Sequence, residues 1–152
     1  MMIANPTLAE ILYVVNNLRD QSRKEIFQAT EATPERYALA LHSAHGFRWV
    51  GYHNGAPAAI LGATRQHKGV WSVFGFGTDD WIKVWRSVTR TALKEMFPAV
   101  EGSGCHRAHC ITLAESADVH RWLKVLGATE ESVMRGYGRD GEDYTMFSWT
   151  KG

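Results

Sequence analysis

The first forty residues carry hydrophobic positions at helical spacing. The sequence TLAE at residues 7–10 has the pattern of a capping box, and the apolar residues that follow recur three or four apart, which predicts a helix over residues 7–18. A second capping pattern, SRKE at residues 22–25, predicts a shorter helix or a turn. The sequence TPE at residues 33–35 predicts the start of a third helix, because proline is well tolerated in a first helical turn.

The spacing then changes to that of strands. The runs FRWVGYH (residues 47–53) and APAAILGAT (residues 56–64) flank Asn54-Gly55, a dipeptide typical of a two-residue type I′ hairpin. A third extended run, GVWSVFGF at residues 69–76, follows a polar loop. We therefore expect three successive strands in this part of the chain.

Helices and strands alternate in the second half. A helix is predicted over residues 79–96, ending before Pro98. Its predicted core face consists of Ile82, Trp85, Thr89, Ala92, Leu93 and Met96. HRAHCITLA predicts a strand over residues 106–114, and the helix that follows, over residues 119–126, is closed by Gly127. TEESVMRGYG and YTMFSWT predict two last strands around the turn RDGED. This order is that of an α+β chain with a single mixed sheet flanked by helices, forming one domain over residues 1–152.

Composition narrows the possible function. The chain has 152 residues, of which 45% are hydrophobic and 22% charged, as in an ordinary globular protein with a real core. The formal net charge is +1 and the basic residues are spread along the chain, which argues against a nucleic-acid or membrane partner. The N-terminal residues lack the basic start of a signal peptide, and no apolar run reaches the length of a membrane span. We therefore expect a cytoplasmic protein.

The element order, with HNGAPAAILGA as its hairpin and HRWLKVLGATEES near its end, resembles the GNAT superfamily of N-acetyltransferases. The likeness extends from about residue 7 to residue 150, with a first strand only as the stub MMIAN. A narrower resemblance, carried by RWLKVLGA and DGEDYTMFSWTKG, is to small GNAT-like proteins of short-tailed bacteriophages, some of them internal virion proteins.

The resemblance implies an acetyl-CoA-dependent N-acetyltransferase that acts on an amine, including an amine of a host protein. It also leaves a second hypothesis open, because a fold does not fix a function. In that hypothesis the chain is a non-catalytic phage protein that acts in the virion or binds a host target. A phage-encoded protein would lie in the cytoplasm of the host cell or in the virion.

In the GNAT family, a loop with a Gln/Arg-x-x-Gly-x-Gly/Ala pattern holds the pyrophosphate of acetyl-CoA at a helix N-terminus. The corresponding stretch here is FGTDDWIK, residues 76–83. The resemblance implies that acetyl-CoA is bound by Val73, Phe74, Gly75, Phe76, Gly77, Thr78 and Lys83. Asp79 and Asp80 would repel a pyrophosphate, so the alternative interpretation is a turn in which Thr78 or Asp79 only caps the helix.

The catalytic candidates also come from the resemblance. Many of these enzymes use a tyrosine as general acid, and Leu123 occupies the position where that tyrosine usually lies. Ser116 stands where the family often has an asparagine and is a candidate proton donor, while Glu115 and His109 are candidate bases. The alternative interpretations are a solvated acid for Glu115 and a structural strand histidine for His109.

Two other patterns predict no further site. CHRAHC at residues 105–110 contains zinc-ligand residue types, but a strand places them alternately on two faces, so neither a metal site nor a disulfide is expected. Of the six tryptophans, Trp71, Trp85 and Trp122 fall at apolar-periodic positions, so they are expected in the core and not on a base-stacking surface.

Overall fold

The computed structural model describes residues 1–151 of the chain. Its centre is a seven-stranded sheet in the order β1-β2-β3-β4-β5-β7-β6, in which only β4 and β5 are parallel neighbours. The strands are β1 (Met2–Ala4), β2 (Gly46–His53), β3 (Ala56–His67), β4 (Val70–Gly77), β5 (Arg107–Leu113), β6 (Thr129–Met134) and β7 (Tyr144–Thr150). The predicted α+β class with a mixed sheet is confirmed.

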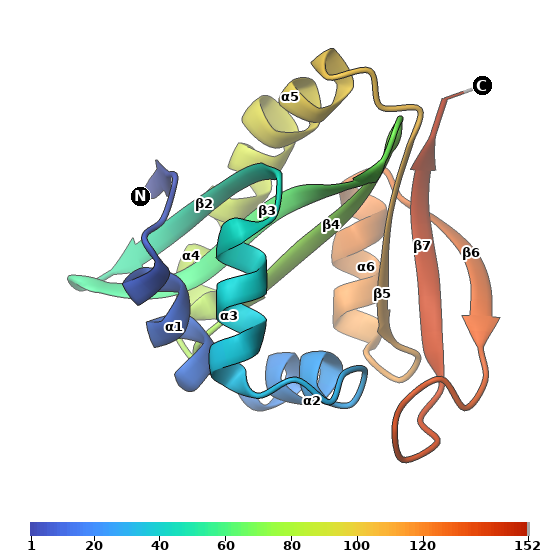
Figure 1. Ribbon diagram of the computed structural model, residues 1–152, viewed down its shortest axis with the longest axis horizontal. Helices are drawn as coiled ribbons and strands as arrows, with labels where there is room; N and C mark the ends of the chain where they lie inside the picture. Colours follow the sequence, from blue (N-terminus) through green and yellow to red (C-terminus); the bar gives the residue numbers. More distant parts are fainter. Residues whose placement is uncertain (152) are drawn as a thin grey trace.

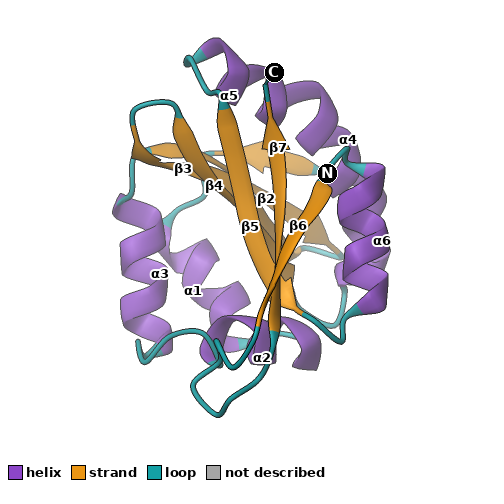
Figure 2. Ribbon diagram, turned by 90° about the vertical axis from the view of Figure 1, so that its right-hand side faces the viewer, coloured by secondary structure: helices purple, strands orange, loops and turns teal. Residues whose placement is uncertain are grey.

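Helices cover both faces of the sheet. They are α1 (Leu8–Asn16), α2 (Asp20–Phe27), α3 (Pro34–Ser43), α4 (Trp81–Thr91), the π-helical segment η1 (Ala92–Met96), α5 (Phe97–Gly102) and α6 (Ala117–Val125). Helices α1 and α3 lie on one face, α4, α5 and α6 lie on the other, and α2 lies across one end (Figure 2). None of the helices within residues 1–151 has the length and apolar character needed to cross a lipid bilayer.

The predicted starts of the first two helices have different outcomes. Thr7 and Glu10 form the expected capping box of α1. The capping pattern predicted from Ser22 is wrong, because α2 already begins at Asp20 and its N-cap residue Arg19 makes no capping hydrogen bond with its side chain. Ser22 is buried, and its Oγ accepts a hydrogen bond from the backbone N–H of Gly77 at 3.4 Å. The hydroxyl of Ser22, which the sequence pattern predicted as a helix cap, therefore makes a contact with a distant strand instead.

The turns agree with their sequence signals. Asn54 and Gly55 have φ angles of 48° and 77°, the two positive values that a type I′ hairpin requires. The strand predicted over residues 129–138 is shorter in the structure, where β6 ends at Met134. Gly136 follows with a φ angle of 65°, which turns the chain out of the extended conformation.

The long helix that begins with α4 was predicted to end before Pro98, and this prediction is wrong. The helix passes through η1 and continues as α5 to Gly102, with Pro98 in the first turn of α5. In a regular helix, a proline ring meets the carbonyl four residues earlier and removes one backbone hydrogen bond. The wider turn of η1 lies directly before Pro98 and lets the chain continue in helical form.

The predicted core face of this long helix is only partly correct: Ala92 and Met96 are buried as predicted, but three of the six residues are exposed. Ile82, Trp85 and Leu93 are 65%, 39% and 47% exposed. The residues of α4 that are buried lie one position away: Trp81, Val84, Val88 and Thr91. The helix carries two adjacent apolar stripes with the same spacing, so periodicity alone cannot select the buried one.

Candidate functional site

Strands β4 and β5 pair only at their beginnings. The paired residues are Val70 with Arg107, Trp71 with Ala108, and Ser72 with His109. Beyond Ser72 the strands diverge toward α2 (Figure 1). The edge of β4 that faces β5 therefore lacks a partner strand from Val73 onward.

A cavity of about 440 Å³ lies where the two strands separate. It is bounded by β4 and β5, by α2 and α3 at one side, and by α6 at the other. Of the residues predicted to bind acetyl-CoA, Val73, Phe74, Gly75 and Phe76 line this cavity. The other three, Gly77, Thr78 and Lys83, do not contribute to its wall. The strand part of the predicted site is therefore at the cavity, and the loop and helix part is not.

Glu25 of α2 stands in the wall of the cavity. Its Oε1 accepts hydrogen bonds from the hydroxyl of Thr112, from the backbone N–H of Leu113 at 3.4 Å and from Nε2 of Gln21 at 3.1 Å. Burial disfavours the carboxylate and raises the pKa of Glu25 to about 6, although these hydrogen bonds oppose the shift. Sequence reasoning missed this residue, because its environment is built by a strand far along the chain.

The raised pKa of Glu25 makes the stability of the protein depend on pH. Glu25 has a higher pKa in the folded state, about 6, than in the unfolded state, 4.5. Its contribution to the free energy of unfolding is therefore greatest below pH 4.5 and is lost as pH rises through about 6. The 1.5-unit difference between these two values corresponds to about 2 kcal/mol. We expect Glu25→Gln to gain about that much stability relative to wild type between pH 4 and pH 7.

Urea unfolding of both proteins across this pH range measures the gain. Taking the difference between variant and wild type cancels the titration of the other carboxylates. Glu35→Gln, at an exposed position of α3, is the matched control. A difference between Glu25→Gln and wild type that stays constant with pH would show that Glu25 titrates normally.

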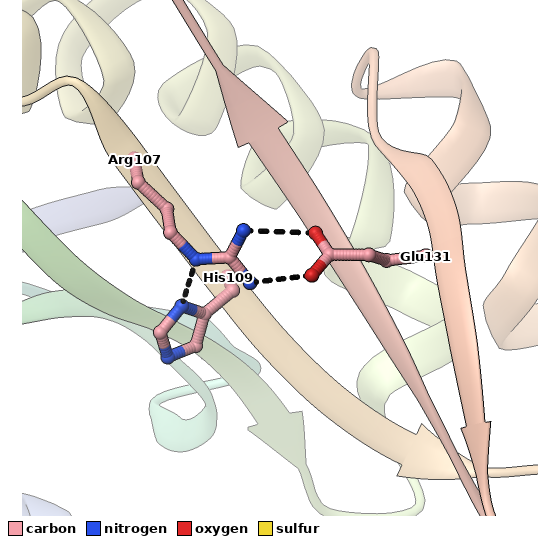
Figure 3. Close-up of polar contacts among 3 residues, drawn as sticks. All are labelled: Arg107, His109 and Glu131. Atoms are coloured by element: carbon pink, nitrogen blue, oxygen red, sulfur yellow. Dashed lines mark hydrogen bonds and ion pairs between the residues drawn. The ribbon is translucent and has the colours of Figure 1, made fainter.

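His109 lies at the narrow end of the cavity, beside the last paired residue of β4. Nε of Arg107 donates a hydrogen bond to Nδ1 of His109 at 2.9 Å, and the two Nη atoms of Arg107 hold both carboxylate oxygens of Glu131, at 2.8 and 3.1 Å (Figure 3). Burial and the charge of Arg107 lower the pKa of His109. The Arg107 bond leaves the ring proton on Nε2, so neither ring nitrogen of the neutral histidine is a free base.

The other predicted catalytic residues lie away from the cavity. Glu115 is exposed in the turn between β5 and α6. Ser116 is buried at the N-cap of α6, and its side chain makes no capping hydrogen bond. Neither residue lines the cavity, whereas Leu123, which replaces the family's tyrosine, is buried and does line it. The structure therefore brings His109 and Leu123 to the cavity and leaves Glu115 and Ser116 outside it.

The loop after β4 uses its polar groups internally. Only residues 78–80 separate β4 from α4. The N–H of Thr78 donates to the carbonyl of Ala58 at 2.9 Å, and the N–H of Trp81 donates to the carbonyl of Thr78 at 2.9 Å. The hydroxyl of Thr78 accepts from the N–H of Asp80 at 3.2 Å, which closes a local turn ahead of the helix. These amides are therefore not available to an anion.

A tryptophan bridges the two helices that follow β4 and β5. Nε1 of Trp122, on α6, donates a hydrogen bond to Oγ1 of Thr89, on α4, at 2.8 Å. Its ring meets that of Trp81 edge to face, with the ring centroids 5.4 Å apart. The space that remains near the N-termini of α4 and α6 is a second cavity of about 50 Å³, walled in part by Arg19 and Asp118. That volume suits a few water molecules.

The region CHRAHC shows no metal geometry. Within residues 1–151, no three histidine, cysteine, aspartate or glutamate side chains gather closely enough to hold a metal ion. Cys105 and Cys110 are free thiols. Burial raises the pKa of Cys110 to about 12, so this thiol stays protonated at neutral pH.

No protein-family model matches the sequence, and no curated protein sequence matches it either. Solved structures of acetyltransferases share the fold over nearly the whole chain. A ribosomal-protein-alanine N-acetyltransferase from Brucella melitensis superposes with a TM-score of 0.76 at 13% identity, covering 99% of each chain. An acetyltransferase of the GNAT family from Streptococcus pneumoniae gives 0.69 at 16% identity, covering 100% of each chain.

A third match is an N-acetyltransferase from Staphylococcus aureus, with a TM-score of 0.73 at 9% identity, covering 99% of this chain and 97% of the other. The protein therefore has the GNAT fold. At these identities, the likeness establishes the arrangement of helices and strands, while activity depends on the residues of the site.

The residues at the N-terminus of α4 do not fit acetyl-CoA, the cofactor that the fold implies. The amides of Thr78, Asp80 and Trp81, which lie where a pyrophosphate would be held, are bonded within the protein. Asp79 and Asp80 are exposed at the same place and would repel it. Trp122 crosses the gap between α4 and α6, and the cavity beside it that Arg19 and Asp118 line has a volume of about 50 Å³. The alternative interpretation from the sequence, a turn without a phosphate, agrees with these contacts.

Proposed function

We propose that this protein is a GNAT-fold binding protein that does not transfer acetyl groups, and that its ligand occupies the cavity between β4 and β5. The observation that carries the proposal is the bridge formed by Trp122, which is hydrogen-bonded to Thr89 and packed on Trp81 across the gap between α4 and α6. The cavity on the far side of this bridge has the volume of a small-molecule site.

The decisive experiment is titration of the full chain with acetyl-CoA by calorimetry, with thermal shift in parallel. We expect no saturable heat up to millimolar acetyl-CoA, which places any Kd above about 1 mM. We also expect no rise in melting temperature, because a ligand stabilises a protein only in proportion to its occupancy.

The Asp79→Asn, Asp80→Asn double variant is the matched control, because it removes the like charge without changing the size of the side chains. It too is expected not to bind, since the amides of the loop remain bonded within the protein. Micromolar binding by the wild-type chain would contradict the proposal. Binding gained only by the double variant would show that charge alone, and not the geometry of the loop, excludes the cofactor.

A second candidate function is acetyl-CoA-dependent acetylation of an amine. One observation favours it: Glu25, with its pKa raised to about 6, stands where β4 and β5 separate and could serve as a general base. This function requires Trp122 to leave the gap between α4 and α6. Release of free CoA that depends on an added amine, and that is lost in Glu25→Gln, would favour this candidate.

We also propose that the protein acts in a phage particle or in the infected host cell. The likeness of RWLKVLGA and DGEDYTMFSWTKG to small proteins of short-tailed bacteriophages supports a phage-encoded chain that works in the virion or on a host protein. Purified particles of the encoding phage, probed with an antibody against the chain, test the first location. A chain found only in the infected-cell lysate would favour a host-directed role.

A further inference from the structure

We infer that the cavity between β4 and β5 selects a small apolar monoamine: one ammonium group on an aromatic or branched aliphatic body. The inference rests on the proposed use of this cavity for binding and adds the chemistry of the ligand. It follows from the single charged side chain in the wall, from the partners of that side chain, and from the character of the remaining surface.

The carboxylate of Glu25 has one oxygen in use and one without a partner. All three donors that reach it, from Thr112, Leu113 and Gln21, bond to Oε1. Within residues 1–151, no protein donor bonds to Oε2. A carboxylate in an apolar wall is stabilised by a cation that also donates hydrogen bonds, and an ammonium group does both.

The neighbouring cation does not fill this role. Nη2 of Arg19 donates to Oε1 of Gln21 at 2.8 Å, and the guanidinium lies over the ring of Trp81, 5.5 Å from its centroid. Arg19 lines the 50 Å³ cavity and not the larger one. Arg19 therefore approaches Glu25 from the side of the smaller cavity. Its positive charge favours the carboxylate form of Glu25, but its guanidinium does not bond to the carboxylate, so Oε2 stays open to a ligand in the large cavity.

The other titratable groups near Glu25 are neutral at pH 7. Burial raises the pKa values of Tyr37, Cys110 and Tyr144, which come from α3, β5 and β7. The hydroxyl of Tyr144 donates to the backbone carbonyl of Glu25 at 2.7 Å, which fixes that residue in place. His109 also lines the cavity, with its pKa lowered by burial and by the charge of Arg107, so Glu25 and His109 are the two lining groups that can take up a proton as pH falls from 7.

The rest of the wall favours an apolar body and disfavours a second charge. Most of the lining is apolar; it includes Phe74, Ile111, Val119, Leu123, Met134 and Met146. Among residues 1–151, no lysine, arginine or aspartate lines the cavity. A diamine would bury its second ammonium group without a partner, and an anion would meet Glu25, so both are disfavoured.

Calorimetry on the full chain without acetyl-CoA tests this selectivity with four probes. They are 2-phenylethylamine, the neutral 2-phenylethanol, the diamine 1,4-diaminobutane and the anion 3-phenylpropionate. We expect 2-phenylethylamine to bind at least about tenfold more tightly than 2-phenylethanol, since a buried charged hydrogen bond contributes more than a neutral one. The diamine and the anion are expected not to bind at the same concentrations.

Two variants and a change of pH test whether the preference for the amine comes from Glu25 in this cavity. Glu25→Gln should reduce the affinity for the amine at least about tenfold and leave the affinity for the alcohol unchanged, because it removes the charge and keeps the shape. Ile111→Trp, which fills the cavity from β5, should abolish binding of both. Wild-type affinity for the amine should fall about tenfold from pH 7 to pH 5, as Glu25 takes up a proton, and the same comparison in Glu25→Gln measures any part of the fall that comes from His109. Glu35→Gln is the control on an exposed face, and circular dichroism reports the fold of each variant.

The inference is overturned if the alcohol binds as tightly as the amine, if the diamine binds as tightly, or if folded Glu25→Gln keeps full affinity for the amine. Absence of amine binding also overturns it, whatever the result with acetyl-CoA. Binding of acetyl-CoA to the wild-type chain would instead overturn the proposed function and leave the selectivity for monoamines standing. The two failures are therefore distinguishable.

Discussion

Replacing Trp122 with alanine is expected to lower the free energy of unfolding by about 3 kcal/mol, within the range for removal of a large aromatic side chain. The indole is half-buried and joins α4 to α6 by one hydrogen bond and one edge-to-face ring contact. Alanine removes both and leaves a void between the helices. Urea unfolding followed by circular dichroism measures the loss.

Trp122→Phe and Thr89→Val separate the two contributions. Each removes the hydrogen bond and keeps most of the packing, so each is expected to cost about 1 kcal/mol. If all three variants lost the same free energy, the hydrogen bond and not the packed ring would hold the helices together. If Trp122→Ala unfolded like wild type, the bridge would not exist in solution.

The same alanine variant tests the exclusion of acetyl-CoA. We expect Trp122→Ala still not to bind it, because the loop amides stay bonded within the protein and Asp79 and Asp80 remain. Micromolar binding gained by this one change would show that Trp122 alone closes the site. The gap between α4 and α6 would then be a cofactor site blocked by one side chain.

Gly77→Ala is the second change with a large expected effect, a loss of about 3 kcal/mol, at the upper end of the usual cost of overpacking. A Cβ at this position would lie 2.6 Å from the carbonyl oxygen of Ala58 and 2.8 Å from Cε3 of Trp81. The first of these atoms belongs to the backbone of the neighbouring strand and cannot move without disturbing the sheet. Thermal and urea unfolding measure the loss.

Gly102→Ala is the matched control, because a Cβ there would meet no atom within 4 Å. We expect its stability to stay within about 0.5 kcal/mol of wild type. If Gly77→Ala were as stable as this control, the indole of Trp81 would not pack against the loop. Glycine at position 77 is thus explained by close packing, whereas the sequence alone also allowed close approach of a phosphate.

Local signals in the sequence predicted most of the fold. The capping box at Thr7 and the dipeptide Asn54-Gly55 specify their structures through neighbouring residues alone, and both are confirmed. The α+β class with one mixed sheet flanked by helices also agrees with the structure. These features depend on short-range chemistry or on a topology shared by many sequences.

The features that sequence did not predict depend on contacts between distant segments. The pKa of Glu25 is raised by burial in a pocket that distant segments build, and the hydrogen bond that partly offsets this burial comes from Thr112, 87 residues further along the chain. Trp122 became part of a bridge because Thr89 lies opposite it on another helix. The buried stripe of α4 was chosen by the packing of Trp81 on the loop, and a periodic pattern contains no information about that choice.

The π-helical segment before Pro98 keeps one side of a long helix aligned with the sheet. Val88, Ala92, Met96 and Val100 are all buried, at intervals of four residues. Four residues of an α-helix turn about 40° more than a full circle, so three such steps would rotate Val100 by about 120° relative to Val88. The one extra residue in the turn of η1 reverses about 100° of that rotation. The four side chains therefore lie close to a straight row, so the same side of the helix faces the sheet from Val88 to Val100.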